Sequence, residues 1–250
     1  MLEESEYSPW VKTIFASIKN ATFFRGFGSY SRFNRLLLEQ LVFKTKKVRK
    51  MGWEHWRYTT DRVDRRLKRE PEHPDLWSKI LEKDESGGGL TKDEHDSNAS
   101  LFMIAGTETT ATALSGTTYN LLKNPEHLKK LTEEIRTAFE DFDDVTLEDL
   151  ARLKYLQACL QEGLRMYPPV PISLPRRTPI EGAEICGKSI PGDVSIGINQ
   201  FATYRMSEHF KNPWEFHPER WLGDPEYKDD HLDAMEPFSV GPRNCLGRVS

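Results

Sequence analysis

The ten residues Phe238-Ser-Val-Gly-Pro-Arg-Asn-Cys-Leu-Gly247 carry the strongest signal in this sequence of 250 residues. The two glycines of the segment let the backbone bend tightly and approach a large flat ligand. Its arginine places a permanent cation two residues before the thiol, where it favours a thiolate and can also bind a ligand carboxylate. Its phenylalanine supplies a ring beside whatever the sulfur binds. We interpret the segment as a ligand-binding loop whose five informative residues, a combination expected by chance on the order of 10⁻⁴, are Phe238, Gly241, Arg243, Cys245 and Gly247.

The composition indicates a folded globular chain and excludes several classes of protein. The 35 Lys and Arg residues nearly balance the 39 Asp and Glu residues, and a net charge of −4 does not suit a dedicated polyanion binder. Thirteen Phe, eight Tyr and six Trp residues argue against disorder. No apolar run reaches the roughly 18 residues of a membrane span, and the acidic first residues do not form a secretory signal. Three cysteines without a C-x-x-C pair exclude a disulfide framework, and we expect Cys159 and Cys186 to be small buried residues.

The first ninety residues are predicted to form a basic helical region. Between Lys44 and Arg69 there are eleven Lys or Arg residues against three acidic ones, and apolar residues recur at helical spacing. Such a face could contact nucleic acid, an anionic membrane surface or an acidic partner. It could equally be a helix face that only contacts water.

A single long helix is predicted over 91–124. Thr91 and Glu94 form a capping box, and the next stop signal is Asn124-Pro125, which gives a length on the order of 48 Å. The apolar centre, Leu101–Gly106, should be buried on all sides. The polar residues that follow, Thr107-Glu-Thr-Thr110, break the local rules for a buried helix, and such breaks often mark a functional site.

The rest of the chain divides into a helical, a β and an irregular part. Asn124 is expected to cap a helix that runs to about residue 139, and a helical stretch is expected over 146–169. Short strands and turns are expected over 170–201, and a long ordered coil over 211–250. The predicted fold class is mainly α with a small β part.

With the Cys245 motif the chain resembles the cytochrome P450 family, whose pattern F-x-x-G-x-R-x-C-x-G it matches at every specified position. The resemblance implies that Cys245 is the thiolate ligand of heme iron. It also implies an E-x-x-R motif, which Glu162 and Arg165 supply, with Arg220 as their third partner. Two other matches, at Glu54 and Glu133, lack the Met-Tyr-Pro-Pro that follows Arg165. These three residues are expected to give structural support to the heme pocket.

The polar break in the long helix matches the family's motif for the helix that crosses the distal heme face. The resemblance implies that Thr109 holds the hydrogen-bond network for oxygen activation, that Glu108 relays protons to it, and that Gly106 opens the groove where oxygen binds. Arg176 lies where the family places a heme-propionate partner, and Arg177 is its less favoured neighbour. Substrate contacts are expected above the heme from Phe102, Ala105, Thr109, Val170, Ile172 and Leu174.

The resemblance implies a heme-thiolate monooxygenase, nearest to the fungal microsomal enzymes of secondary metabolism. It would insert one oxygen atom of O2 into an apolar organic substrate, with heme b as cofactor and electrons from NADPH through NADPH-cytochrome P450 reductase. No nucleic acid partner is expected. Full-length members lie on the cytoplasmic face of the endoplasmic reticulum membrane, and we expect membrane association only through an N-terminal anchor that this chain lacks.

The chain departs from the family in length. We expect residues 1–250 to be one partial P450 domain, without the N-terminal portion and without the segment after the heme-ligand loop. Two alternatives therefore stay open. One is a catalytically inactive truncated fragment that cannot close around heme. The other is a basic-helix module that binds nucleic acid through 44–69, which leaves the Cys245 motif unexplained.

Overall fold

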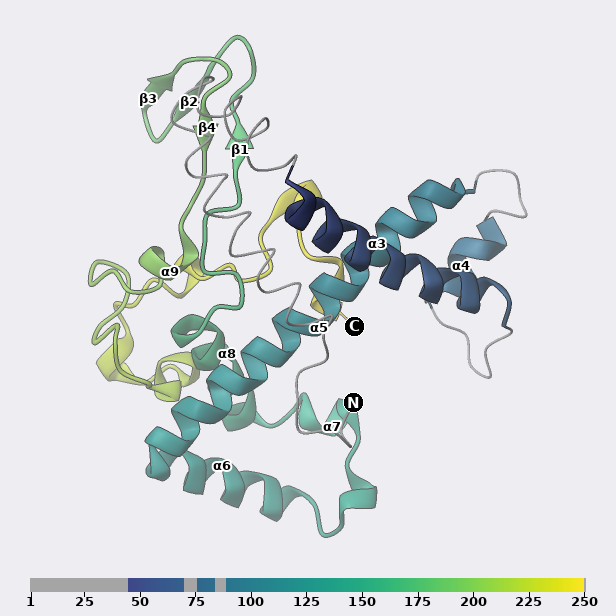
Figure 1. Cartoon of the computed structure of the whole chain (residues 1–250). Coiled ribbons are helices and arrows are strands. Elements are labelled where there is room, and N and C mark those ends of the chain that lie inside the picture. The colour runs from purple at the N-terminus through teal and green to yellow at the C-terminus, as the bar shows by residue number, and fades with distance from the viewer. Residues whose placement is uncertain (1–44, 70–75, 84–88, 250) are drawn as a thin grey trace. The chain divides into compact units, whose positions relative to one another are not determined.

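The computed structural model describes residues 45–69, 76–83 and 89–249. The chain forms two compact units, Met1–Thr107 and Glu108–Ser250, and each is described by itself. Figure 1 labels the elements of both. Of the predicted basic helical region 1–90, residues 1–44, 70–75 and 84–88 lie outside the described residues.

The first unit contains α3 (Lys46–Leu67), α4 (Leu76–Lys83) and the beginning of the long helix α5 (Lys92–Lys123). The buried side chains of α3 are Thr59 and Val63. Lys92 on α5 forms an ion pair with Asp64 on α3, with 3.0 Å between Nζ and Oδ1. The ring of Trp77 on α4 meets the ring of Phe102 on α5 edge to face, with 6.4 Å between centroids. These contacts join the three helices.

The start of α5 is the predicted capping box. The Thr91 amide donates to Glu94 Oε2 at 2.8 Å, and the Glu94 amide donates to Thr91 Oγ1 at 3.4 Å. The prediction that the apolar centre is buried on all sides is wrong, because Leu101 is 60% exposed. One face of this turn packs within the first unit, where Met103 and Ile104 lie with Tyr58 of α3, and Leu101 points away from that packing.

In the second unit, α6 (Pro125–Ala138) follows α5 directly. Pro125 occupies the first turn, as predicted. Asn124, however, makes no side-chain cap. Its side-chain amide donates instead to the Asn120 carbonyl at 2.7 Å. It therefore satisfies a carbonyl at the end of α5 and no amide at the start of α6.

The helical stretch expected over 146–169 is two helices, α7 (Leu147–Leu150) and α8 (Lys154–Met166). Thr146 caps α7, since its hydroxyl accepts from the Asp149 amide at 3.1 Å. The start of α8 is capped from another helix. Glu134 on α6 accepts the backbone amides of Tyr155 and Leu156, each at 2.9 Å. This contact satisfies two of the amides that a helix start leaves without a partner, and it explains why α8 starts afresh after α7.

The main core of the second unit lies between α5, α6, α8 and the coil that follows. Its buried members are Leu121, Leu131, Tyr155, Cys159 and Phe216. Cys159 is 1% exposed, as predicted for a small buried residue. A smaller core joins Tyr204, Phe210 and Met235.

The β part consists of two antiparallel pairs, one nested inside the other along the chain. β1 (Arg176–Arg177) pairs with β4 (Ser195–Ile196), and β2 (Ala183–Ile185) pairs with β3 (Lys188–Ile190). The prediction that Cys186 is buried is wrong. It lies exposed at the tip of the β2–β3 hairpin with φ 50°, next to Gly187 with φ 72°. Positive φ at both central positions is what a tight hairpin turn requires.

The coil after the sheet is ordered by short helical turns, namely α9 (Gln200–Thr203), η3 (Pro218–Leu222), η4 (Pro225–Tyr227), η5 (Leu232–Ala234), η6 (Gly241–Arg243) and η7 (Leu246–Val249). The mainly helical architecture with a small β part is therefore confirmed. Within the described ranges, no helix is both long enough and apolar enough to cross a membrane.

Candidate functional site

The Cys245 segment forms a closed loop. The Cys245 amide donates to the Phe238 carbonyl at 2.8 Å, and the Asn244 amide donates to the Gly241 carbonyl at 3.0 Å. Gly241 has φ 76°, and no heavy atom lies within 4 Å of the position that a Cβ would take there. The backbone angle, and not the space, therefore requires glycine at this position. Gly247 lies in the short helical turn η7 just after the cysteine.

The side chains of this loop present a thiol at the surface. Cys245 is exposed and forms no disulfide. Arg243 is also exposed, and Phe238 is half-buried. The donor set is one soft sulfur ligand with a guanidinium and an aromatic ring close to it in the sequence. That set fits a heme group bound through iron and a carboxylate.

Glu162 on α8 lies at the centre of a buried network. Arg165 donates to it twice, Nε to Oε2 at 2.8 Å and Nη2 to Oε1 at 2.7 Å. Arg220 on η3 donates from Nε to Oε1 at 3.2 Å. The His217 amide and the Trp221 indole each add a bond of 2.9 Å. The carboxylate and both guanidinium groups are 0% exposed.

The same network holds the irregular coil through its backbone. Arg165 donates to the carbonyls of Tyr204, Pro213 and Glu215 at 2.7–2.9 Å. Arg220 donates to the carbonyl of Lys211 at 3.1 Å and to the carboxylate of Asp230. A buried guanidinium has five N–H donors to satisfy, and these carbonyls supply the acceptors.

Electrostatics keep Glu162 ionised in this buried position. Burial alone would raise the pKa of Glu162, but the hydrogen bond and charge of Arg165, together with the charge of Arg220, outweigh it and hold that pKa below its ordinary value. The carboxylate of Glu162 and the guanidinium groups of Arg165 and Arg220 are therefore all charged.

The sequence predicted that Glu162, Arg165 and Arg220 interact, and the structure places all three in contact. The sequence-based prediction did not include Asp230 and Trp221. Trp221 directly follows Arg220 in the segment Pro218-Glu-Arg-Trp221, whereas nothing in the sequence pointed to Asp230. At the two other E-x-x-R matches, the glutamate is exposed and pairs with a lysine on its own helix. Glu54 lies 3.7 Å from Lys50, and Glu133 lies 3.8 Å from Lys129.

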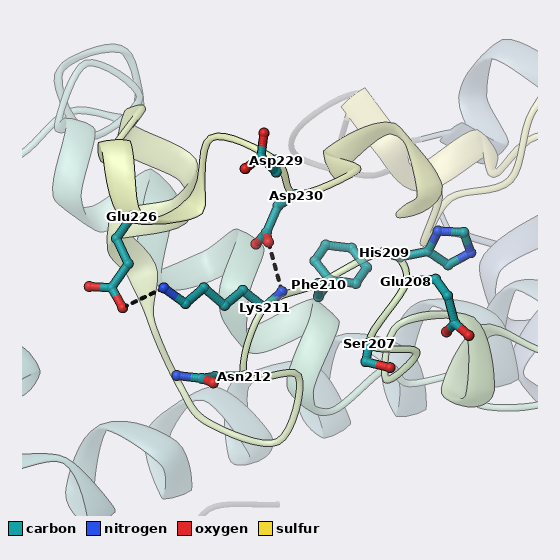
Figure 2. Close-up of a pocket in the computed structure, with 9 residues that line it drawn as sticks. All are labelled: Ser207, Glu208, His209, Phe210, Lys211, Asn212, Glu226, Asp229 and Asp230. Atoms are coloured by element: carbon teal, nitrogen blue, oxygen red, sulfur yellow. Dashed lines mark hydrogen bonds and ion pairs between the residues drawn. The ribbon is translucent and has the colours of Figure 1, made fainter.

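A surface cleft of about 420 Å³ borders this network and was not predicted. Figure 2 shows Lys211 between two carboxylates, with Glu226 Oε1 3.1 Å from its Nζ and Asp230 Oδ1 2.7 Å from its backbone nitrogen. Asp230 thus lines the cleft and also pairs with the buried Arg220. None of the sequence-predicted site residues lines the cleft, whose walls are Ser207, Glu208, His209, Phe210, Lys211, Asn212, Glu226, Asp229 and Asp230.

The residues expected on the distal helix lie within two turns of α5. Glu108 and Thr109 are half-buried and belong to the second unit. Ala105 and Gly106 are exposed and belong to the first unit, as does the half-buried Phe102. No heavy atom lies within 4 Å of the position that a Cβ at Gly106 would take.

The segment before the sheet presents apolar side chains and a cation. Ile172 is 43% and Leu174 is 40% exposed, and Val170 is half-buried. Arg176 on β1 is exposed and donates to the carbonyl of Pro175 at 3.1 Å. Arg177 instead pairs with the carboxylate of Asp193. Among the described residues no carboxylate forms an ion pair with Arg176.

The sequence as a whole matches known proteins. The family model of cytochrome P450 matches residues 1–249. A cytochrome P450 monooxygenase, efuB of Hormonema carpetanum, is 48% identical over 99% of this chain and 49% of its own length. The averantin hydroxylase of Aspergillus parasiticus is 41% identical over 99% of this chain and 50% of its own length. The chain thus spans about half the length of these relatives.

A solved structure shows the same fold. The heme domain of cytochrome P450DA aligns with 98% of this chain and 50% of its own, with a TM-score of 0.70 and 22% sequence identity. The closed cysteine loop and the buried Glu162 network thus occur in a chain whose sequence and fold both match one family. The chain belongs to the cytochrome P450 family.

Proposed function

We propose that the protein carrying this chain is a heme-thiolate monooxygenase that inserts one oxygen atom of O2 into an apolar secondary metabolite. The observation that carries the proposal is the loop closed by the Cys245 amide and the Phe238 carbonyl, because it presents one thiol at an exposed position. The names of the relatives support the reaction class, since one is a hydroxylase and the other a monooxygenase.

In this proposal the chain's own residues bind and orient heme b. The Cys245 thiolate would ligate the iron, and the ring of Phe238 would lie beside the sulfur. Arg243 and Arg176 would hold the heme propionates through charge-assisted hydrogen bonds. When bound, heme supplies the iron chemistry that activates O2 with electrons from NADPH through NADPH-cytochrome P450 reductase.

Glu108 and Thr109 hold and move protons in this proposal. The two residues are neighbours on α5 and are both half-buried. The carboxylate of Glu108 would take up a proton from solvent water, and the hydroxyl of Thr109 would relay a proton from water by accepting it and donating its own toward the heme side of the helix. Gly106 keeps the adjoining helix surface free of a side chain.

The substrate is proposed to be apolar because the candidate contacts are apolar. None of the five candidate contacts besides Thr109 carries a polar side-chain atom, and three of them, Ala105, Ile172 and Leu174, are more than one-third exposed. Covering exposed apolar side chains with an apolar ligand is favourable, because it removes their surface from water and so lowers the free energy of binding. We also propose that the whole protein works at the cytoplasmic face of the endoplasmic reticulum, where its reductase would be found.

The proposal is tested by the carbon-monoxide difference spectrum of the reduced, heme-loaded protein. Cys245→Ser should abolish the red-shifted band of thiolate heme, whereas Cys186→Ser, which removes the other exposed thiol, should leave it unchanged. Retention of the band in the Cys245→Ser protein would show that another residue binds the iron. Absence of the band from the unmutated 250-residue chain, with the band present in the whole protein, would favour the reading of an inactive fragment.

A further inference from the structure

Two histidines and a carboxylate meet on the side of η3 that faces α6. His127 is in the first turn of α6, His217 directly precedes η3, and Glu219 lies within η3. Each offers one ligand atom within 4.8 Å of the other two, and all three side chains are half-buried. Among the described residues, this is the one group of three or more His, Cys, Asp and Glu side chains arranged in this way.

The spacing is close to that of a metal site. Ligand atoms around a tetrahedral zinc ion lie about 3.3 Å apart, as follows from Zn–N and Zn–O distances near 2.0–2.1 Å. His127 Nδ1 lies 3.6 Å from Glu219 Oε1. This pair would have to approach by only about 0.3 Å to reach the zinc spacing.

The hydroxyl of the buried Tyr155 contacts two of the proposed ligand atoms. It lies 2.8 Å from His127 Nδ1 and donates to Glu219 Oε1 at 3.2 Å, so both contacts would be exchanged for contacts to the ion when zinc binds. Glu215 Oε2 lies 2.9 Å from His217 Nε2, and the group of three leaves the fourth position of a tetrahedral ion to water.

An approach from solvent is also present. A cleft of about 460 Å³ has both histidines in its wall, together with Glu126 and Glu215.

We propose that His127, His217 and Glu219 bind one zinc ion. Lys130 Nζ now lies 3.1 Å from Glu219 Oε1, and its side chain is 54% exposed, so it can move into solvent when the cation binds. The ion would join α6 to η3, one residue from Arg220 of the buried network. Because the unfolded chain lacks this arrangement, zinc binding would stabilise the folded state. The site does not depend on heme or on the monooxygenase proposal.

The test is a calorimetric titration of the heme-free chain with ZnCl2 at pH 7.5, together with thermal unfolding with and without zinc. The exposed thiols of Cys186 and Cys245 are blocked with N-ethylmaleimide in every sample, because thiols also bind zinc. We expect one saturable zinc ion per chain and a higher unfolding temperature with zinc. His217→Ala and Glu219→Gln should each weaken binding at least tenfold and remove the rise in unfolding temperature.

The control is His231→Ala. His231 and His209 form a second histidine pair, 5.9 Å between ring centroids, outside the proposed site. This variant should bind zinc as the unmutated chain does. Glu219→Gln keeps the shape of the side chain, so it reports on the site even if His217→Ala does not fold. Absence of saturable binding to the unmutated chain, or equal affinity in the Glu219→Gln and unmutated proteins, would overturn the proposal.

Discussion

Thr117 on α5 packs directly against Gly163 on α8. A Cβ placed on Gly163 would lie 2.1 Å from Thr117 Oγ1, 2.9 Å from its Cβ and 3.0 Å from its Cγ2. A second close approach occurs nearby, where a Cβ on Gly116 would lie 2.5 Å from the side chain of Tyr167. The two helices can cross at this distance only because a glycine stands at each contact. One of these glycines lies between Glu162 and Arg165.

Gly163→Ala should therefore destabilise the protein despite the better helix propensity of alanine. Since the atoms of Thr117 are buried and close to the helix backbone, the helices must move apart, at a cost of about 1–3 kcal/mol. Urea denaturation of the variant and the unmutated chain measures this. Gly52→Ala, in α3, is the control, because no heavy atom lies within 4 Å of its Cβ position. It should be neutral or stabilising, and an equal loss in both variants would contradict the packing argument.

Arg165→Ala should be the more damaging change. It removes the donor to three carbonyls of the coil and leaves the buried carboxylate of Glu162 with only Arg220 as counter-charge. Breaking a buried pair in this way costs about 3–5 kcal/mol. Denaturation of the isolated variant measures the loss. Arg152→Ala removes an exposed pair with Asp149, in which Arg152 is 79% exposed, and should leave the free energy of unfolding nearly unchanged.

The sequence predicted this network because its parts are local. Glu162 and Arg165 are three residues apart and so share one helix face, and Arg220 lies in a recognisable motif. The break before α8 could not be predicted in the same way, because its cause is Glu134, which caps α8 from another helix. Such a contact exists only once α6 and α8 have packed together.

The prediction that Cys186 is buried failed for a different reason. Cysteine is usually buried, and composition alone gave no reason to place it in a turn. The signal lay in the next residue, since Gly187 allows the positive φ that the β2–β3 turn needs. The division into two units was not predicted either, because it falls at Thr107, inside the single helix α5.

The stability contributed by Glu162 should depend on pH. Its pKa in the folded state is below the ordinary value of 4.5, so the unfolded chain binds the proton more readily. The contribution is therefore complete above pH 4.5 and is lost as the pH falls below 4.5 through the folded-state pKa. The difference in unfolding free energy between the unmutated chain and Glu162→Gln should shrink from pH 7 to pH 3. A constant difference would contradict it. Glu184→Gln, on exposed β2, controls for the loss of a carboxylate.

Cys159 should resist alkylation in the folded heme-free chain. Burial, together with the carboxylates of Glu219 and Glu134, raises the pKa of its thiol to about 12, so the reactive thiolate is scarce at pH 8. Iodoacetamide followed by peptide mass spectrometry should find Cys186 and Cys245 modified, because both are exposed. Cys159 should react only after denaturation. Equal labelling of all three thiols in the folded chain would show that α8 is not packed as described.

Thr109→Ala should separate proton delivery from heme binding in the proposed enzyme. The hydroxyl of Thr109 is half-buried on α5, and in our proposal it presents protons to bound oxygen without contacting the iron ligand. The heme-loaded variant should keep the carbon-monoxide spectrum of thiolate heme, consume O2 and form severalfold less product per O2 consumed. Thr109→Ser, which restores a hydroxyl, should recover most of that ratio, and Thr118→Ala, at an exposed position of the same helix, should not change it. If Thr109→Ala instead lost its heme, or if its ratio of product to O2 were unchanged, the role assigned to Thr109 would be wrong.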